Sequence, residues 1–506
     1  MKISFESKAP AAKSGSEALV VFAHSAKDGL RLGAGAKTAD KAAKGALAAA
    51  AKAENFAGRI GQVLSVPAAA HGAARTVLLV GLGDAGDKVA AADVEKTGSA
   101  IVSALAGRKL ASVTIDSVDD ITAQLDADET ADRLALSLLL STYRFDKYKT
   151  KGGKDKSGAL KSAVVVTSAA TAARKLFAAS EKVAAGVFLT RDLVTEVPNV
   201  LYPESFAAII KKELAPMGIK VDILDVPKMK KLGMNSLLGV GQGSVKPPRL
   251  VTMTYNGGKK GQRPVALVGK GVTFDTGGIS LKPGAGMEDM KWDMAGAGAV
   301  VGAMKALAGR KAKANVVGVV ALAENMPSGS ASRPSDVVTS MSGQTIENLN
   351  TDAEGRLILC DALTYTQRFF KPTHIVDLAT LTGAVLIALG EEYGGLFSND
   401  NGFAGVLRDA GEAVGEHLWQ LPLHEAWDKS LDSPIADMKN ISGSRFAGSA
   451  IGAHFLKRFI EPGVTWAHLD IAGMAWTGKE RPSVPKGATG YGVRLLDRYI
   501  RDTVEG

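Results

Sequence analysis

The sequence predicts an α/β protein of two domains, a small N-terminal α/β domain and a larger C-terminal α/β domain with a central mixed sheet. The 506 residues exceed one typical domain. A hydrophobic content of 46% with 22% charged residues is typical of a globular rather than a disordered chain. Strand-like and helix-like segments alternate along the chain, which favours the α/β class.

The first 140 or so residues carry the elements of the small domain. Short apolar runs predict strands, and longer Ala-rich segments predict helices. In chain order, we expect a strand at 18–23, a helix at 38–56, a strand at 75–80, a helix at 92–106 and a strand at 111–115.

The stretch 143–163 is dense in Lys and Gly, and we expect it to form an exposed, mobile connection. A helix is predicted at 177–194. The domain boundaries follow from these two segments, with the N-terminal domain at 1–160, a linker and connecting helix at 161–190, and the larger domain at 191–506.

Residues 81–86, Gly-Leu-Gly-Asp-Ala-Gly, fit the pattern G-x-G-x-x-G behind the predicted strand at 75–80. A dinucleotide site would also need an acidic residue about 20 positions further on, at the end of a second strand. The next predicted strand instead ends at Asp116. A tight turn between strand and helix explains the glycines more simply.

A run of charged residues at 350–356 suggests chemistry. Asp352, Glu354 and Arg356 alternate with small residues, so they would share one face if the segment is extended. Such a group needs a bound multivalent cation, an ion-pair network or a role in acid/base catalysis. The plainer alternative is a surface turn with an ion pair, which contributes little to stability.

A second group of charges lies upstream in an apolar, Gly-rich setting. The Val-rich run 264–269 predicts a buried strand, and Lys270 stands where this strand is expected to end. Asp275, Lys282 and Asp293 follow. Ligands in open α/β sheets gather at the carboxyl ends of strands, so we expect a site here.

The carboxylates of Asp275, Asp293, Asp352 and Glu354 carry four negative charges, which two divalent cations would balance. The pattern HExxH is absent, and the seven histidines show no convincing ligand spacing. A carboxylate shell accepts zinc, manganese or magnesium. Lys270 could join it only after losing its proton, which burial and nearby dications favour; a solvated lysine is the alternative.

These motifs carry a family resemblance. NTDAEGRL at 350–357 and VGKGVTFDTGGISLKP at 268–283 are similar to the signatures of the leucyl aminopeptidases, the two-metal cytosolic aminopeptidases that include bacterial aminopeptidase A. The likeness continues through DLATLTGA to HLDIAGMAW and covers most of residues 190–500.

The resemblance implies a metal-dependent catalytic domain that releases N-terminal residues, preferably Leu and other apolar ones, from peptides with a free N-terminus. It assigns Asp275 and Glu354 to both of two Mn²⁺ or Zn²⁺ ions, Asp352 to one ion, and Lys270 with Asp293 to the other. It further implies that Lys282 and Arg356 are catalytic and that a bicarbonate on Arg356 passes protons.

The same resemblance implies a homohexamer and a pocket for the first substrate side chain. Judged alone, the apolar residues of this pocket would be ordinary core residues. The implied pocket residues are Met290, Thr380, Leu381, Gly383 and Ala472.

Composition bears on location and on a rival function. A single cysteine, Cys360, excludes an intramolecular disulfide and suits a cytoplasmic protein, and no apolar stretch reaches the roughly 20 residues of a membrane helix. A net charge of +9 favours polyanions, so DNA binding is an alternative, additional role. No base-reading motif supports it, and the Lys-rich stretch 147–161 is more simply a solvated linker.

Overall fold

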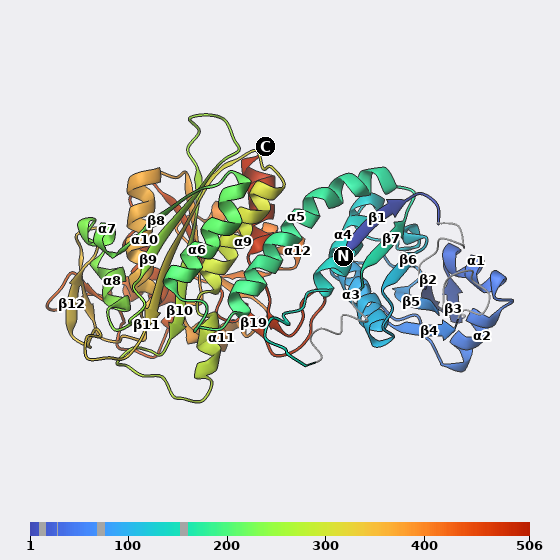
Figure 1. Ribbon diagram of the computed structural model, residues 1–506, viewed down its shortest axis with the longest axis horizontal. Coiled ribbons are helices and arrows are strands. Elements are labelled where there is room, and N and C mark those ends of the chain that lie inside the picture. Colours follow the sequence, from blue (N-terminus) through green and yellow to red (C-terminus); the bar gives the residue numbers. More distant parts are fainter. Residues whose placement is uncertain (10–16, 28, 68–75, 152–159, 506) are drawn as a thin grey trace. The chain divides into compact units, whose positions relative to one another are not determined.

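A computed structural model describes the chain except for residues 10–16, 28, 68–75, 152–159 and 506 (Figure 1). The chain divides into two compact units. The first comprises Met1–Ala184 and Lys479–Lys486, and the second comprises Ala185–Gly478 and Gly487–Gly506. Both units combine sheets with helices, so the predicted two-domain α/β fold is confirmed.

The first unit is built on a seven-stranded sheet of order β1-β7-β6-β2-β5-β4, with β3 paired to β2. Only β3 and β4 run antiparallel to their neighbours. The strands are β1 Lys2–Glu6, β2 Ala18–Ala26, β3 Gly29–Leu32, β4 Val63–Pro67, β5 Thr76–Asp84, β6 Ser112–Ile115 and β7 Ser162–Val166. The helices are α1 Ala34–Ala42, α2 Ala46–Ala53, α3 Ala91–Gly107 and α4 Ala127–Ser141, and helix α5 Ala170–Thr195 begins in this unit and ends in the second.

The boundary between the domains differs from the expected one. Residues 161–190 begin with β7, which pairs in parallel with both β1 and β6 and therefore belongs to the first sheet rather than to a linker. Helix α5 is longer than the predicted 177–194. Of the connection expected at 143–163, residues 152–159 lie outside the described part of the chain.

Two local predictions in the first unit are wrong. The single helix expected at 38–56 is broken into α1 and α2, because Lys44 and Gly45 both have positive φ, at 53° and 85°. The glycine motif does not follow its strand, since β5 continues to Asp84. A Cβ on Gly81 would lie 2.2 Å from the carbonyl oxygen of Arg59, so close backbone packing accounts for this glycine.

The second unit is built on an eight-stranded sheet of order β16-β15-β18-β14-β10-β11-β9-β8. Its central strands β11, β10, β14 and β18 are parallel, whereas β9 and β15 pair antiparallel with them, which confirms the mixed sheet. The strands are β8 Lys220–Leu224, β9 Arg249–Asn256, β10 Val265–Asp275, β11 Asn315–Asn325, β14 His374–Ala379, β15 Gly394–Ser398, β16 Leu418–Gln420 and β18 Thr465–Asp470.

Helices cover both faces of this sheet. They are α6 Pro203–Leu214, α7 Val226–Lys231, α8 Asn235–Gly241, α9 Ala295–Gly309, α10 Gly355–Phe370, α11 Gly383–Leu389, α12 Asn401–Val414, α13 Glu425–Lys429, α14 Gly448–Lys457 and α15 Val493–Tyr499. Short strands complete the unit: β12 Asp336–Thr339, β13 Thr345–Asn348, β17 Met438–Lys439, β19 Trp476–Thr477 and β20 Gly487–Ala488.

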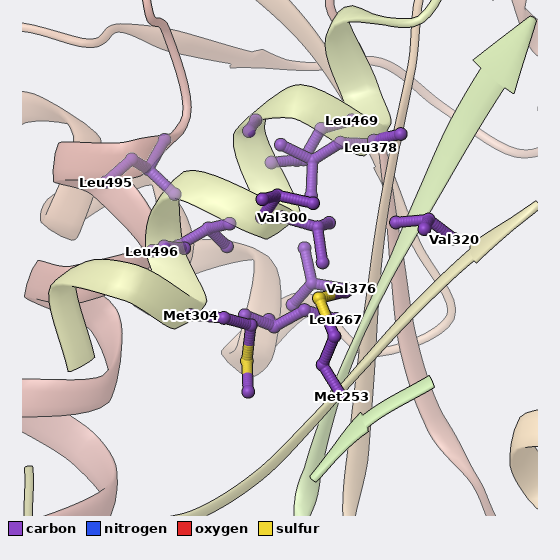
Figure 2. Packing of buried hydrophobic residues seen from close by; sticks show 14 of the residues in the cluster. Met253, Leu267, Val300, Met304, Val320, Val376, Leu378, Leu469, Leu495 and Leu496 are labelled. Atoms are coloured by element: carbon purple, nitrogen blue, oxygen red, sulfur yellow. The ribbon is translucent and has the colours of Figure 1, made fainter. Parts of the chain in front are cut away.

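Two hydrophobic cores follow from the alternation of side chains along the strands. In β10, Val265 and Leu267 enter the core shared with α6, α9, α12 and α15, part of which Figure 2 shows. Ala266 and Val268 enter the opposite core, shared with α8, α10 and α14. Burial on both faces explains why this strand reads as a continuous apolar run.

The elements that carry the predicted site differ from expectation in two ways. Strand β10 does not end before Lys270 but continues to Asp275, because it stays paired with β11. Residues 350–356 are not extended: a turn contains Asp352, and α10 begins at Gly355. The shared-face argument for these charges was therefore wrong, although the charges do converge.

Among the described residues, no helix is long and apolar enough to span a bilayer.

Candidate active site

Three of the four predicted acidic ligands meet at one point. Asp275 ends β10, Asp293 follows the 3₁₀ helix η4 (Met287–Trp292), and Glu354 directly precedes α10. One carboxylate oxygen from each lies within 4.8 Å of the others, and all three residues are buried. The fold thus places acids from three separate elements around one small volume.

Lys270 lies among these acids, in the middle of β10 and almost fully buried. Its Nζ is 2.8 Å from Asp293 Oδ1, 2.8 Å from Glu354 Oε1, and donates to the carbonyl of Thr380 at 2.7 Å. Gly355 makes room for it, because a Cβ there would lie 2.7 Å from Lys270 Cε. The glycine of the NTDAEGR motif therefore leaves the space that the Lys270 side chain occupies.

The ionisation of Lys270 is set by the acids around it. Burial by itself lowers the pKa of this ammonium, but the carboxylates of Asp293 and Glu354 outweigh burial and raise the pKa above its ordinary value. Loss of the proton would thus need the positive charge of bound cations, as the expectation assumed.

Lys282 links Asp352, the fourth predicted acidic ligand, to this group. Its Nζ lies 2.9 Å from Asp275 Oδ2 and contacts Asp352 Oδ1. The side chain is 21% exposed, compared with 3% for Lys270. Burial lowers the pKa of Lys282, but the charges of Asp275 and Glu354, with the hydrogen bonds to Asp275 and Asp352, together outweigh burial and raise the pKa. The ammonium is therefore charged at neutral pH, and it is within reach of solvent.

Arg356 occupies the first turn of α10 and is buried. Its Nη1 donates to the backbone carbonyl of Asn440 at 2.7 Å, whereas its Nε has no hydrogen-bond partner among the described residues. Burial lowers the pKa of this guanidinium to about 10, against the opposing charges of Glu354 and Asp470. It therefore remains a cation at neutral pH.

Of the predicted pocket residues, Thr380 contacts this group directly, and two others contact Asp470. Thr380 Oγ1 donates to Asp293 Oδ1 at 2.7 Å, and the N–H groups of Leu381 and Ala472 point to one carboxylate oxygen of Asp470, at 3.1 and 3.4 Å. Of the other two, Met290 lies in η4 shortly before Asp293, and Gly383 begins α11.

Sequence reasoning missed three polar residues that hold the site. Asn325 ends β11 opposite Asp275 and donates to Asp275 Oδ1 at 2.8 Å. Its position at the carboxyl end of a central parallel strand could have revealed it. Asp470, at the end of β18, gives the same signal. Asn440 gives none, because it follows only the two-residue strand β17.

The residues present fit a divalent cation. Burial raises the pKa of Asp275 and Asp293, and the neighbouring charge of Glu354 raises both further, so the group gains by binding positive charge. Asp293 Oδ2 is buried without a hydrogen-bond partner in the described part of the chain, which leaves it available as a ligand. Carboxylate oxygens are ligands that hard and borderline divalent cations accept.

Comparisons with known proteins agree with this arrangement. The catalytic domain of the cytosol aminopeptidase family matches residues 188–497, and the N-terminal domain of the same family matches residues 19–152. A probable cytosol aminopeptidase of Caulobacter vibrioides is 50% identical over 97% of each chain, and one of Rhizobium etli is 51% identical over 93% of each.

Solved structures of the same architecture are also similar. The bottromycin maturation enzyme BotP in complex with Mn is 35% identical, with a TM-score of 0.84 over 96% of this chain and 99% of that one. A mutant of tomato leucine aminopeptidase is 32% identical, with a TM-score of 0.86 over 99% of this chain and 96% of that one. Together with the acidic site, these matches show that the chain belongs to the cytosol aminopeptidase family and is a peptide hydrolase.

Proposed function

We propose that this aminopeptidase depends on two divalent metal ions, Mn²⁺ or Zn²⁺, and prefers Leu and other apolar residues at the N-terminus of its peptide substrates. The observation that carries the metal dependence is the convergence of Asp275, Asp293 and Glu354 within 4.8 Å in a buried site. The related BotP was solved in complex with Mn, which supports a divalent ion of this kind.

In this proposal Asp275 and Glu354 would contact both ions, Asp352 would complete the shell of one, and Lys270 with Asp293 that of the other. When bound, such ions lower the pKa of a water molecule towards neutrality and polarise the scissile carbonyl. Binding of the substrate's free α-amine at this site would restrict the enzyme to unblocked N-termini.

Lys282 would stabilise the transition state. Negative charge develops on the carbonyl oxygen as water attacks, and a preorganised donor close to that oxygen lowers the barrier. The ammonium of Lys282 is charged and partly exposed, whereas that of Lys270 is enclosed by acids and a carbonyl. Lys282 therefore acts as an electrophile and not as a base.

Arg356 would hold a bicarbonate ion that carries protons between the attacking water and the departing amine. Its guanidinium stays charged near neutral pH, so it cannot serve as the base itself. The unpartnered Nε, buried beside the acids, supplies a donor for a small oxyanion.

Further parts of the proposal rest on the family resemblance. The first substrate side chain would fit beside Thr380, Leu381 and Ala472, the assembly would be a homohexamer, and the enzyme would act in the cytoplasm. An additional DNA-binding role stays a prediction.

Removal of metal should abolish the activity. Hydrolysis of Leu-p-nitroanilide is measured before and after chelation, then with zinc and manganese added back separately. We expect activity to fall to background with the chelator and to return with one or both metals, because the clustered acids need the counter-charge. An N-acetylated substrate serves as a control and should stay uncleaved. Full activity in protein shown to be metal-free by elemental analysis would refute the proposal.

Replacement of Arg356 by alanine should remove the response to bicarbonate. We expect kcat to fall at least about 10²-fold, which is the low end for a lost proton-transfer element, while the metal content stays at that of the parent. Rates are measured in degassed buffer with and without added bicarbonate. Arg368→Ala, which changes an exposed arginine of the same helix, is the control and should respond like the parent. Equal stimulation of the Arg356 variant would place the anion elsewhere.

A further inference from the structure

Asn440 is the most completely hydrogen-bonded side chain near the acidic site, and it is fully buried. Its Oδ1 accepts from the N–H of Leu349 at 2.8 Å and from that of Asn350 at 3.4 Å. Its Nδ2 donates to Asn348 Oδ1 at 2.9 Å and to the carbonyl of Asn350 at 2.7 Å, with the carbonyl of Ala353 at 3.4 Å. An amide has two donors and two acceptor positions, and all are used here.

The segment that Asn440 holds is the turn 348–353, which directly precedes Glu354 and contains Asp352. Asn348 ends β13 (Thr345–Asn348), and the rest of this turn, residues 349–353, has irregular backbone that neither a helix nor a sheet ladder fixes. Its other side is fixed by Thr351, whose hydroxyl donates to the carbonyl of Gly277 at 2.6 Å and whose carbonyl accepts from Asn325 Nδ2 at 3.0 Å. Asn440 supplies the contacts on the other side of the turn, to Leu349 and Asn350.

The backbone of Asn440 reaches a second part of the site. Its N–H donates to the carbonyl of Glu347 at 3.0 Å, which anchors it at the start of the turn. Its carbonyl accepts from Arg356 Nη1 at 2.7 Å. One residue, 90 positions away from Asn350 in the sequence, thus contacts both the turn that carries Asp352 and leads to Glu354, and the side chain of Arg356.

We propose that Asn440 is a positioning residue: its amide fixes the turn 348–353, so that Asp352 and Glu354 face the metal site, and its carbonyl orients Arg356. The inference rests on the proposed metal-dependent function. A buried amide with every hydrogen bond made specifies a unique geometry, and loss of one partner leaves several buried groups without theirs.

The test compares Asn440→Ala with Asn440→Asp, which keeps the volume and the acceptor for Leu349 but loses all the N–H donations. We expect both variants to bind Mn²⁺ at least about tenfold more weakly in titrations with the metal alone, the lower end for a lost outer-shell partner of a metal ligand. At saturating metal we expect kcat to remain reduced, and by a larger factor than the factor by which KM rises. Hydrogen exchange at amides 349–353 should accelerate without acceleration across β10.

Asn315→Ala is the matched control. Asn315 is a second buried asparagine with a full set of contacts, since it accepts from the N–H of Gly258 and donates to the carbonyls of Lys259 and Gln262. It begins β11, roughly 30 Å along the strand from Asn325. We expect this variant to lower the melting temperature as the Asn440 variants do, yet to leave Mn²⁺ affinity and kcat unchanged.

The outcomes separate this inference from the proposed function. If the parent binds and needs metal but the Asn440 variants match Asn315→Ala in Mn²⁺ affinity, kcat and exchange, Asn440 is merely structural and the inference is wrong. It is equally wrong if neither Asn440 variant folds, because the residue then supports the whole unit. If the parent itself needs no metal, the proposed function is wrong. Faster hydrogen exchange at 349–353 in the Asn440 variants would still show, in that case, that Asn440 holds the turn.

Discussion

Glu354→Ala should lose both metal ions and nearly all activity. In the proposed assignment this carboxylate contacts both ions, and in the structure it lies beside Lys270 and the two aspartates of the acidic group. The ions supply several kcal/mol of charge stabilisation, and each 1.36 kcal/mol is a factor of ten in rate, so we expect kcat/KM to fall by about 10³-fold or more. Asp275→Ala should behave alike.

Elemental analysis of the purified variants measures the metal content directly. Asp289→Ala, which removes an exposed acid from the same short helix as Met290, controls for the change of charge and should keep two ions per chain. If either Glu354→Ala or Asp275→Ala also keeps two ions, the assignment of bridging ligands is wrong, even if the activity is low.

Lys282→Ala should reduce kcat by about 10²-fold or more, the usual effect of removing one oxyanion donor, with little change in metal content. The reason is that Lys282 would act on charge that appears only in the transition state, so kcat and kcat/KM should fall together. In the structure Lys282 forms ion pairs with Asp275 and Asp352, which are proposed metal ligands, and Lys282 is not itself proposed as a ligand.

Steady-state kinetics at saturating metal separate this role from substrate binding. Lys305→Ala, which breaks the ion pair between Lys305 in the second half of α9 and Glu213 of α6, should keep the parental kcat. A Lys282 variant with nearly normal kcat but a raised KM would show that the lysine binds the ground state instead.

The sequence predicted the identity of the site residues better than their geometry. Two short motifs contain Lys270, Asp275 and Glu354, Asp293 follows the first motif by ten residues, and the structure brings these four together. The prediction of an extended segment at 350–356 was wrong, because helix α10 begins at Gly355 and alternating charges do not indicate the start of a helix. The prediction that β10 ends before Lys270 failed for a related reason: pairing with β11, fifty residues away, decides where a strand stops.

Residues that act through long-range contacts could not be predicted at all. Asn440 contacts a turn about ninety positions earlier, and no spacing rule connects the two segments. The break between α1 and α2 was missed because nothing in the sequence indicates that Lys44 adopts a left-handed backbone conformation, whereas the glycine beside it favours one. Buried elements with regular periodicity, such as α3 and β6, were predicted nearly in full.

The distances in sequence between the partners at this site have a consequence for how the enzyme matures. Lys270 is held by the carbonyl of Thr380, 110 residues later, and the loop of Thr380 is in turn held by Asp470 through the N–H of Leu381 and the hydroxyl of Thr382. Closing such long loops is slow, and contacts of this kind form late in folding. A chain emerging from the ribosome therefore carries all four acids long before strand β18 exists to complete their support. We therefore expect peptidase activity to arise only once nearly the whole chain has been made.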